Sequence, residues 1–376
     1  MLDLAPDLLG LLAEGRDLAV ATVVAVGGSA PRGPGATLAV DSGGEVIGSV
    51  SGGCVEGAVY DLCEEALKTG ESVLEQFGYS DEDAFAVGLT CGGVLDILVT
   101  PLTAATPARA LLRAALEYAA AGEAVALARV VRGPADLLGG ALLVRADGPW
   151  EGGLGGGADL DRTVVAEAGA ALEAGRTGTV EVAADGSRCP GGLTVLVESS
   201  LPPPRMIVFG AVDFAAALVR AGAFLGYHVT VCDARPVFAT RARFPGADEV
   251  VVEWPHRYLR TTRTDSRTVL CVLTHDAKFD IPLLEVALRI PAAFVGAMGS
   301  RRTHSDRDRR LREAGLTDRE LSRLRSPIGL DLGGLTPEET ALSIAAEIVA
   351  ARRGGTGAPL TDIATPIHRV PAARTA

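Results

Sequence analysis

Paired cysteines, long apolar runs and an excess of positive charge are all missing from this chain of 376 residues. Its six cysteines show no C-x-x-C spacing, which argues against a zinc finger and indicates a reducing compartment. No apolar run approaches the about 18 residues of a membrane span, and no basic segment opens a secretory signal. The net charge of −12 argues against nucleic-acid binding. We therefore expect a cytoplasmic protein that binds neither nucleic acid nor membrane.

The length and composition predict a globular protein of two domains. Hydrophobic residues make up 48% of the chain and charged residues 22%, which excludes a disordered protein. Three consecutive prolines at 202–204 form a stiff segment that cannot pair in a sheet. We therefore expect an N-terminal mixed α/β domain over 1–200, a proline-rich linker at 201–205, a second domain over 206–351 and a tail at 352–376.

Apolar patterns before the prolines predict both strands and helices. Strands are expected at 18–26, 37–40, 45–48, 73–77 and 94–99, and later at 124–131, 141–144, 178–182 and 193–198. Helices are expected at 2–15, 55–69, 107–121 and 160–174. We expect the segment after residue 107 to pack with the preceding one in a single sheet-based domain. The glycine-rich run at 152–157 is predicted to be a turn rather than a ligand loop.

Strand and helix patterns alternate after the prolines. Strands are expected at 206–209, 228–232, 248–252, 268–273 and 292–295, and helices at 213–225, 281–288, 303–313, 318–324 and 337–351. This alternation predicts a Rossmann-like, doubly wound parallel sheet. The fold class is therefore α/β in both halves.

Two cysteines lie between glycines, Cys54 in SVSGGCVEG and Cys91 in GLTCGG. Glycine lets a backbone approach a ligand closely, and a thiolate is a ligand for soft metals and a carrier of sulfur. A buried cysteine of the core is the alternative, but glycine neighbours offer it little to pack against. We expect both thiols to act in catalysis or metal binding, with Ser51, Gly52, Gly53 and Gly92 as cofactor-binding neighbours. Cys63, Cys232 and Cys271 lie in apolar patterns and are expected in the core.

A third glycine-rich loop, at 27–35, lies just upstream of Cys54. Arg32 stands in it between Pro31 and Gly33, where it is either an anion clamp together with Gly33 or a solvated side chain. Glu56 is expected to begin a helix, where a carboxylate favours the helix dipole, rather than to act as a general base.

The first strand after the prolines ends in FGAVDFA, which departs from a dinucleotide fingerprint. Gly210 and the final alanine match G-x-G-x-x-G/A, but Val212 replaces the middle glycine and its side chain would collide with a pyrophosphate. Asp233 stands where a ribose-binding acid is expected. Cofactor binding through Gly210 and Asp233 stays open, while NAD(P) is disfavoured by Val212.

Polar residues follow two later strands of the predicted sheet. His275 in LTHDAKFD is either a proton-transfer residue or a loop histidine, and Asp276, Lys278 and Asp280 accompany it. Gly299, Ser300 and Arg301 in GAMGSRRTH offer N–H groups and a guanidinium to an anion; the alternative is a helix capped by Ser300 with solvated arginines.

Nine segments together resemble the XdhC/CoxI family, the accessory factors of xanthine dehydrogenase and related molybdenum hydroxylases. They are 28–33 (GSAPRG), 48–57 (GSVSGGCVEG), 89–93 (LTCGG), 231–236 (VCDARP), 273–280 (LTHDAKFD), 296–304 (GAMGSRRTH), 327–331 (PIGLD), 337–339 (PEE) and 343–348 (SIAAEI). No one segment is decisive, but the ordered set spans nearly the whole chain.

The resemblance implies a chaperone that binds the molybdenum cofactor (molybdopterin), assists its sulfuration and inserts it into an apo molybdenum hydroxylase of the xanthine dehydrogenase type. It also implies a cysteine desulfurase as partner and is compatible with a homodimer. Cys54 and Cys91 then become the residues expected to contact molybdenum or hold sulfur. An accessory role is expected rather than turnover. The alternatives are an NAD(P)-linked oxidoreductase that uses the second domain and a scaffold that only docks the hydroxylase.

Overall fold

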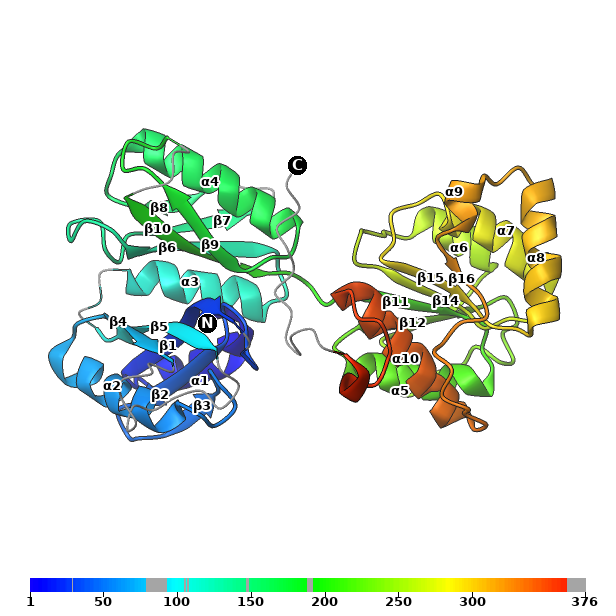
Figure 1. The fold of residues 1–376 in the computed structure, drawn as a ribbon, viewed down its shortest axis with the longest axis horizontal. Coiled ribbons are helices and arrows are strands. Elements are labelled where there is room, and N and C mark those ends of the chain that lie inside the picture. The colour runs from blue at the N-terminus through cyan, green and yellow to red at the C-terminus, as the bar shows by residue number, and fades with distance from the viewer. Residues whose placement is uncertain are drawn as a thin grey trace. The chain divides into compact units, whose positions relative to one another are not determined.

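The computed structural model describes residues 1–28, 30–78, 93–104, 106, 108–146, 149–187 and 192–363. Contacts divide them into two compact units, Met1–Pro202 and Pro203–Ile363, here called unit 1 and unit 2. The division falls within the three prolines, and Figure 1 shows each unit with its own sheets and helices.

Unit 1 contains two five-stranded antiparallel sheets with the same topology, β3-β2-β1-β5-β4 and β8-β7-β6-β10-β9. The first half consists of η1 (Leu2–Leu4), α1 (Ala5–Ala13), β1 (Leu18–Gly27), β2 (Thr37–Asp41), β3 (Val46–Gly48), α2 (Glu56–Thr69), β4 (Val73–Phe77) and β5 (Val94–Leu102). The second consists of α3 (Arg109–Ala120), β6 (Val125–Arg132), β7 (Ala141–Arg145), β8 (Glu151–Gly153), α4 (Ala158–Glu173), β9 (Gly178–Val182) and β10 (Leu193–Ser200). Both halves lie in one compact unit, and each has a sheet of its own.

The two halves also agree in strand register. Each central strand, β1 and β6, pairs with the second and the last strand of its half. The register of β1 skips Val24 and that of β6 skips Val131, which is the same position counted from the start of each strand. Both valines are buried in one small core with Leu98 and Leu196. Unit 1 is thus a structural duplication whose halves meet through equivalent residues.

Helices cover both sheets of unit 1 (Figure 1). The core beneath α2 belongs to the first sheet, and the core beneath α4 belongs to the second. Apolar residues of α1 and α3 share a third core with β1, β2, β6 and β7. Each sheet is therefore apolar on both faces, and this explains why β1 and β6 read as nearly continuous apolar runs.

Unit 2 has a six-stranded parallel sheet in the order β13-β12-β11-β14-β15-β16. Its elements are β11 (Arg205–Phe209), α5 (Asp213–Phe224), β12 (His228–Asp233), β13 (Glu249–Val252), α6 (Pro255–Thr261), β14 (Val269–Val272), α7 (Ala277–Ala287), β15 (Phe294–Ala297), α8 (Arg301–Glu313), α9 (Asp318–Leu321), β16 (Leu324–Arg325), α10 (Pro337–Arg353) and η2 (Leu360–Asp362). Alternate residues of β11 pack against α5 and α10 on one face and against α6, α7, α8 and α9 on the other. The predicted Rossmann-like sheet is confirmed.

Three cysteines expected in the core are buried there. Cys63 lies on the buried face of α2, and Cys232 and Cys271 lie within the sheet of unit 2. Burial raises the pKa of Cys63 and of Cys232 to about 12, so both stay protonated thiols at neutral pH. Cys54, by contrast, is only half-buried. Among the helices that the structure describes, none has the length and apolarity to cross a bilayer.

Candidate functional site

Cys54 lies in the loop that joins β3 to α2. Its side chain is half-buried and packs against the apolar core beneath α2. Its backbone N–H donates to the Ser51 hydroxyl at 3.0 Å, and the Ser51 side chain is buried. Gly52 and Gly53 have φ values of +78° and +115°, a region that other residues rarely adopt. The glycines before Cys54 are therefore required by the path of this loop.

The Glu56 carboxylate folds back and holds the Cys54 loop together. Its Oε1 atom accepts from the backbone N–H groups of Ser51 and Gly52, both at 2.9 Å, and from the Ser49 hydroxyl at 2.7 Å. Its Oε2 atom accepts from the Gly53 N–H at 2.8 Å, and also from the Ser51 hydroxyl. Glu56 is thus the anion that this glycine-rich turn encloses.

The electrostatics of Glu56 follow from these contacts. Burial raises the pKa of Glu56, but hydrogen bonds from Ser51 and Ser49 outweigh it and lower the pKa from 4.5 to about 2. The carboxylate is ionised at neutral pH and cannot serve there as a general base of moderate strength. The N–H groups of Ser51, Gly52 and Gly53, predicted to bind a cofactor, donate to Glu56 in this structure.

The second predicted thiol cannot be placed beside the first. Cys91 and Gly92 lie outside the described residues. Within the described ranges, no group of three or more His, Cys, Asp and Glu side chains is arranged to hold a metal ion. The roles of Cys54 and Cys91 as metal ligands stay predictions.

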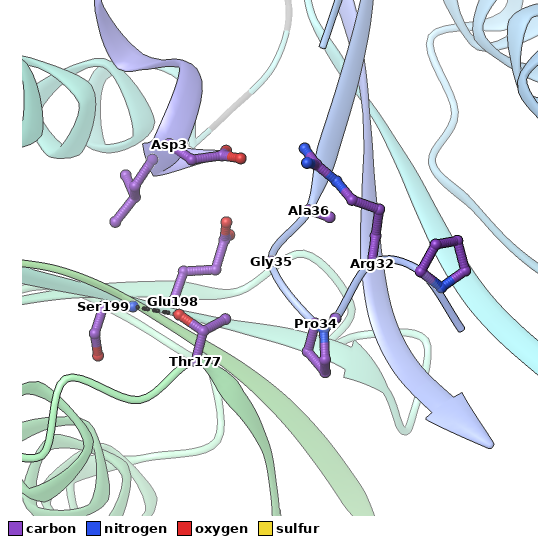
Figure 2. A pocket seen from close by; sticks show the side chains of 11 residues that line it. Asp3, Arg32, Pro34, Gly35, Ala36, Thr177, Glu198 and Ser199 are labelled. Carbon is purple, nitrogen blue, oxygen red and sulfur yellow. Dashed lines mark hydrogen bonds between the residues drawn. The ribbon is translucent and has the colours of Figure 1, made fainter. Parts of the chain in front are cut away.

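Arg32 and Gly33 line a pocket of about 360 Å³ in unit 1 (Figure 2). Its walls come from both halves of the duplication: Leu2 and Asp3 of η1, residues 31–36 before β2, Thr177 before β9, and Glu198 and Ser199 of β10. Gly35, with φ of +90°, lies so close to Thr177 that a Cβ atom there would be 2.6 Å from the threonine Cγ2. A pocket of this size and mixed polarity suits a small ligand.

A buried network of charges forms the floor of this pocket. Glu198 is 2% exposed and bonds through Oε2 to Arg129, itself 4% exposed, at 2.7 Å. The α-ammonium group of Met1 donates to Glu198 and, at 2.5 Å, to the Thr37 hydroxyl. Two cations therefore neutralise Glu198. Its pKa is lowered because these partners outweigh the effect of burial.

In unit 2, Asp233 is engaged by its own chain. Its Oδ2 atom accepts from the Ala211 N–H at 2.8 Å, and both oxygens accept from Arg235. The Asp233 side chain is buried and its pKa is lowered, since these bonds outweigh burial. Gly210 has φ of +108° and leaves no room for a Cβ beside Thr274. The turn and acid of the predicted fingerprint are close together, but the carboxylate already has four hydrogen bonds.

The residues that follow β14 divide into exposed and buried ones. His275 is exposed, and Asp276 caps α7 by accepting from the Lys278 N–H at 3.1 Å. Asp280 is buried and accepts from Arg307 of α8 at 2.9 Å and from the Thr274 hydroxyl. Asp280 therefore joins α7 to α8 rather than lining an open crevice.

Ser300 caps α8. Its hydroxyl accepts from the Thr303 N–H at 3.1 Å, while Arg301 and Arg302 are exposed and form no ion pair within the described residues. Gly299 has φ of +147° and closely approaches Thr303. This geometry is that of the capped helix described above as the alternative, and anion binding by Gly299, Ser300 and Arg301 stays a prediction.

Several residues of the unit 1 pocket, and Arg129 behind Glu198, escaped the sequence reasoning. Asp3 and Thr177 carry no local signal, because a charged residue near a helix start and a threonine before a strand are both ordinary. Arg129 and Glu198 do carry one: each is a charged residue inside an apolar strand pattern, which is typical of a buried ion pair.

Both units of this chain are similar in sequence to known protein families. Residues 206–348 match the family described as the XdhC Rossmann domain, and residues 11–78 and 118–183 match the XdhC and CoxI family. A Bacillus subtilis (strain 168) protein, named as one probable subunit of xanthine dehydrogenase, is 26% identical over 348 residues, which cover 91% of this chain and 96% of that protein.

Two further similarities cover most of the chain. The molybdenum cofactor insertion chaperone PaoD of Escherichia coli (strain K12) is 24% identical over 341 residues, covering 91% of this chain and 85% of its own. A crystal structure described as a xanthine dehydrogenase from Bacillus halodurans superposes with a TM-score of 0.69 at 23% identity, covering 93% of this chain and 96% of that one. That structure has the same fold.

Proposed function

Since this chain belongs to the XdhC and CoxI family, we propose that it is an accessory protein that binds the molybdenum cofactor as cargo and inserts it into a molybdenum hydroxylase of the xanthine dehydrogenase type. The name of the similar Escherichia coli protein, a molybdenum cofactor insertion chaperone, supports this proposal. So does the name of the Bacillus subtilis relative, which refers to xanthine dehydrogenase.

The observation that carries the proposal is the setting of Cys54. Of the cysteines that the structure describes, Cys54 alone is not fully buried, and Glu56 fixes the loop that presents it. Thiolate sulfur is a ligand suited to a soft metal centre. We propose that Cys54 contacts the molybdenum of the cargo, and that Cys91 joins it on the strength of the sequence alone.

Metal retention tests this proposal. The intact chain is mixed with molybdenum cofactor, freed of excess by gel filtration and assayed for molybdenum by mass spectrometry. Cys54→Ala should lower retention by tenfold or more, while Cys63→Ala, which removes a buried thiol of the same unit, should retain as much as the wild type. Full retention by the Cys54→Ala, Cys91→Ala double variant contradicts the thiol role. Binding of the hydroxylase without any molybdenum retention supports a scaffold instead.

Sulfuration is the finer part of the proposal. We propose that a cysteine desulfurase supplies the sulfur as a persulfide while the cofactor is held. A thiol reductant reduces this sulfur to sulfide, and the sulfide replaces a terminal oxo ligand of molybdenum, which leaves as water. Apo hydroxylase should then gain more activity from cofactor presented by this protein together with desulfurase than from either alone. Equal activation without the chain contradicts this step.

NAD(P)-linked oxidoreduction by unit 2 is not part of the proposal. The Asp233 carboxylate, which a ribose would need, accepts from Ala211 and Arg235, and Val212 stands where a pyrophosphate needs glycine. Titration with NADH followed by fluorescence should therefore show no saturable binding at micromolar concentrations. Saturable binding in that range contradicts this interpretation.

A further inference from the structure

The pocket of unit 1 contains two opposite charges that face each other without forming an ion pair together. In Figure 2 the charged ends of Asp3 and Arg32 point toward one another across the pocket. No ion pair joins them, and Arg32 has no hydrogen-bond partner among the residues that the structure describes. Glu198 on the floor is already neutralised by Arg129 and the Met1 ammonium. The Met1 ammonium also lies 3.5 Å from Asp3, but the Asp3 side chain is 47% exposed, so its carboxylate can still accept from a ligand. Asp3 and Arg32 are therefore the exposed charges of the pocket that a ligand can reach.

A ligand that fills this space must offer N–H donors on one side and an oxygen acceptor on the other. Asp3 is an acceptor when ionised, and Arg32 is a donor only. A phosphate held by Arg32 would face the Asp3 carboxylate and be repelled. A 2-amino-4-oxopyrimidine ring has the required edge, since its amino group and ring N–H adjoin its carbonyl oxygen.

We propose that this pocket binds the 2-amino-4-oxopyrimidine edge of the pterin in the molybdenum cofactor. Asp3 accepts from the amino group and the adjacent ring N–H, and Arg32 donates to the carbonyl oxygen. The inference rests on the proposed function, because the pterin is part of the proposed cargo. Leu2, Pro31 and Pro34 line the pocket with apolar surface, which suits the faces of a flat ring.

Paired ring ligands test this assignment. Pterin (2-amino-4-oxopteridine) and lumazine, in which an oxo group replaces the amino group, are titrated against the intact chain by fluorescence anisotropy. The wild type should prefer pterin by about tenfold, since a hydrogen bond to a charged group is lost with lumazine. Asp3→Asn should abolish that preference, and Arg32→Gln should weaken both ligands by about tenfold. Asp159→Asn and Arg162→Gln, an exposed ion pair on α4, serve as controls and should bind like the wild type.

Competing ligands identify which chemistry the pocket recognises. GMP carries the same ring edge. Competition by GMP for the site therefore supports recognition of this edge, and it adds guanine nucleotides as a second class of ligand that carries the edge. Competition by millimolar inorganic phosphate, lost only in Arg32→Gln, overturns the assignment because Arg32 would then hold an anion. Equal binding of pterin and lumazine by the wild type also overturns it.

The outcome is separable from that of the proposed function. Molybdenum retention that needs Cys54 but is unchanged in Asp3→Asn and Arg32→Gln overturns the ring assignment and leaves the chaperone proposal standing. Absence of molybdenum retention in the wild type, with the pterin preference intact, overturns cargo binding while the pocket still recognises the ring.

Discussion

Replacement of Glu56 by glutamine should loosen the Cys54 loop and destabilise unit 1. The amide of glutamine keeps one acceptor oxygen but turns an NH₂ group toward backbone N–H donors that now bond to the carboxylate. The pKa of Glu56 falls from 4.5 to about 2 in the folded chain. A shift of this size corresponds to about 3 kcal/mol. Because Glu56 is only half-buried, solvent screening reduces the expected loss to about 1.5 kcal/mol.

The effect of Glu56→Gln has a defined pH dependence. The pKa is depressed in the folded state, so the stabilisation is complete above pH 4.5 and is lost as the pH falls from 4.5 toward 2. At pH 7 we expect the melting temperature of unit 1 to fall by about 3–6 °C. The difference between variant and wild type should shrink below pH 4.5, where the unfolded wild-type chain takes up the proton.

Tryptophan fluorescence can follow this loss in unit 1 alone. The chain has two tryptophans, Trp150 in unit 1 and Trp254 in unit 2, so a Trp254→Phe background leaves one reporter. Glu65→Gln, an exposed glutamate on the same helix, is the matched control and should leave the melting temperature unchanged. The reasoning is refuted if Glu56→Gln has the same melting temperature as the control at pH 7. It is also refuted if the melting temperature of Glu56→Gln lies equally far below that of the wild type at pH 7 and at pH 3.

Three further outcomes are expected. Arg307→Gln leaves the buried Asp280 carboxylate without its cation and should lower the free energy of unfolding of unit 2 by about 3–5 kcal/mol, as measured in urea. Adding Asp280→Asn should restore part of this loss, and no restoration would contradict the buried pair. Gly210→Ala at φ of +108° places a methyl group 3.0 Å from a backbone nitrogen and should cost more than about 1 kcal/mol, so an unchanged urea midpoint would contradict it. In the native chain a maleimide should label Cys54 while Cys63 stays unlabelled, as peptide mass spectrometry can check; equal labelling of both would contradict their different burial.

The sequence was informative where one periodic signal matched one structural role. Strand–helix alternation predicted the parallel sheet of unit 2, and apolar neighbours predicted the burial of Cys63, Cys232 and Cys271. These predictions depend on local pattern, because burial on both faces of a strand leaves its mark within a few residues.

The duplication of unit 1 could not be predicted in the same way. Its two halves share topology and the bulges at Val24 and Val131, but their loops differ in length and residue type. Equivalent core positions need only be apolar, so the fold persists without a repeated sequence. The sequence therefore predicted a sheet-based domain but not its internal repeat.

The candidate sites lay beyond local pattern for a different reason. Glu56 was assigned to a helix dipole, but its carboxylate reaches back to Ser51 and Gly53 because both glycines before Cys54 adopt positive φ. The pocket joins Asp3, Arg32 and Glu198, which come from three distant segments. Such juxtapositions depend on tertiary packing and are absent from the spacing of residues along the chain.

The matching halves of unit 1 carry different polar groups at equivalent positions. In the first half Thr22 and Thr100 occupy the positions that Arg129 and Glu198 occupy in the second, as the strand registers show. The loop before α4 that corresponds to the Cys54 loop has no cysteine. The two copies therefore differ in chemistry: the first carries the thiol loop, and the second carries the buried Arg129–Glu198 pair.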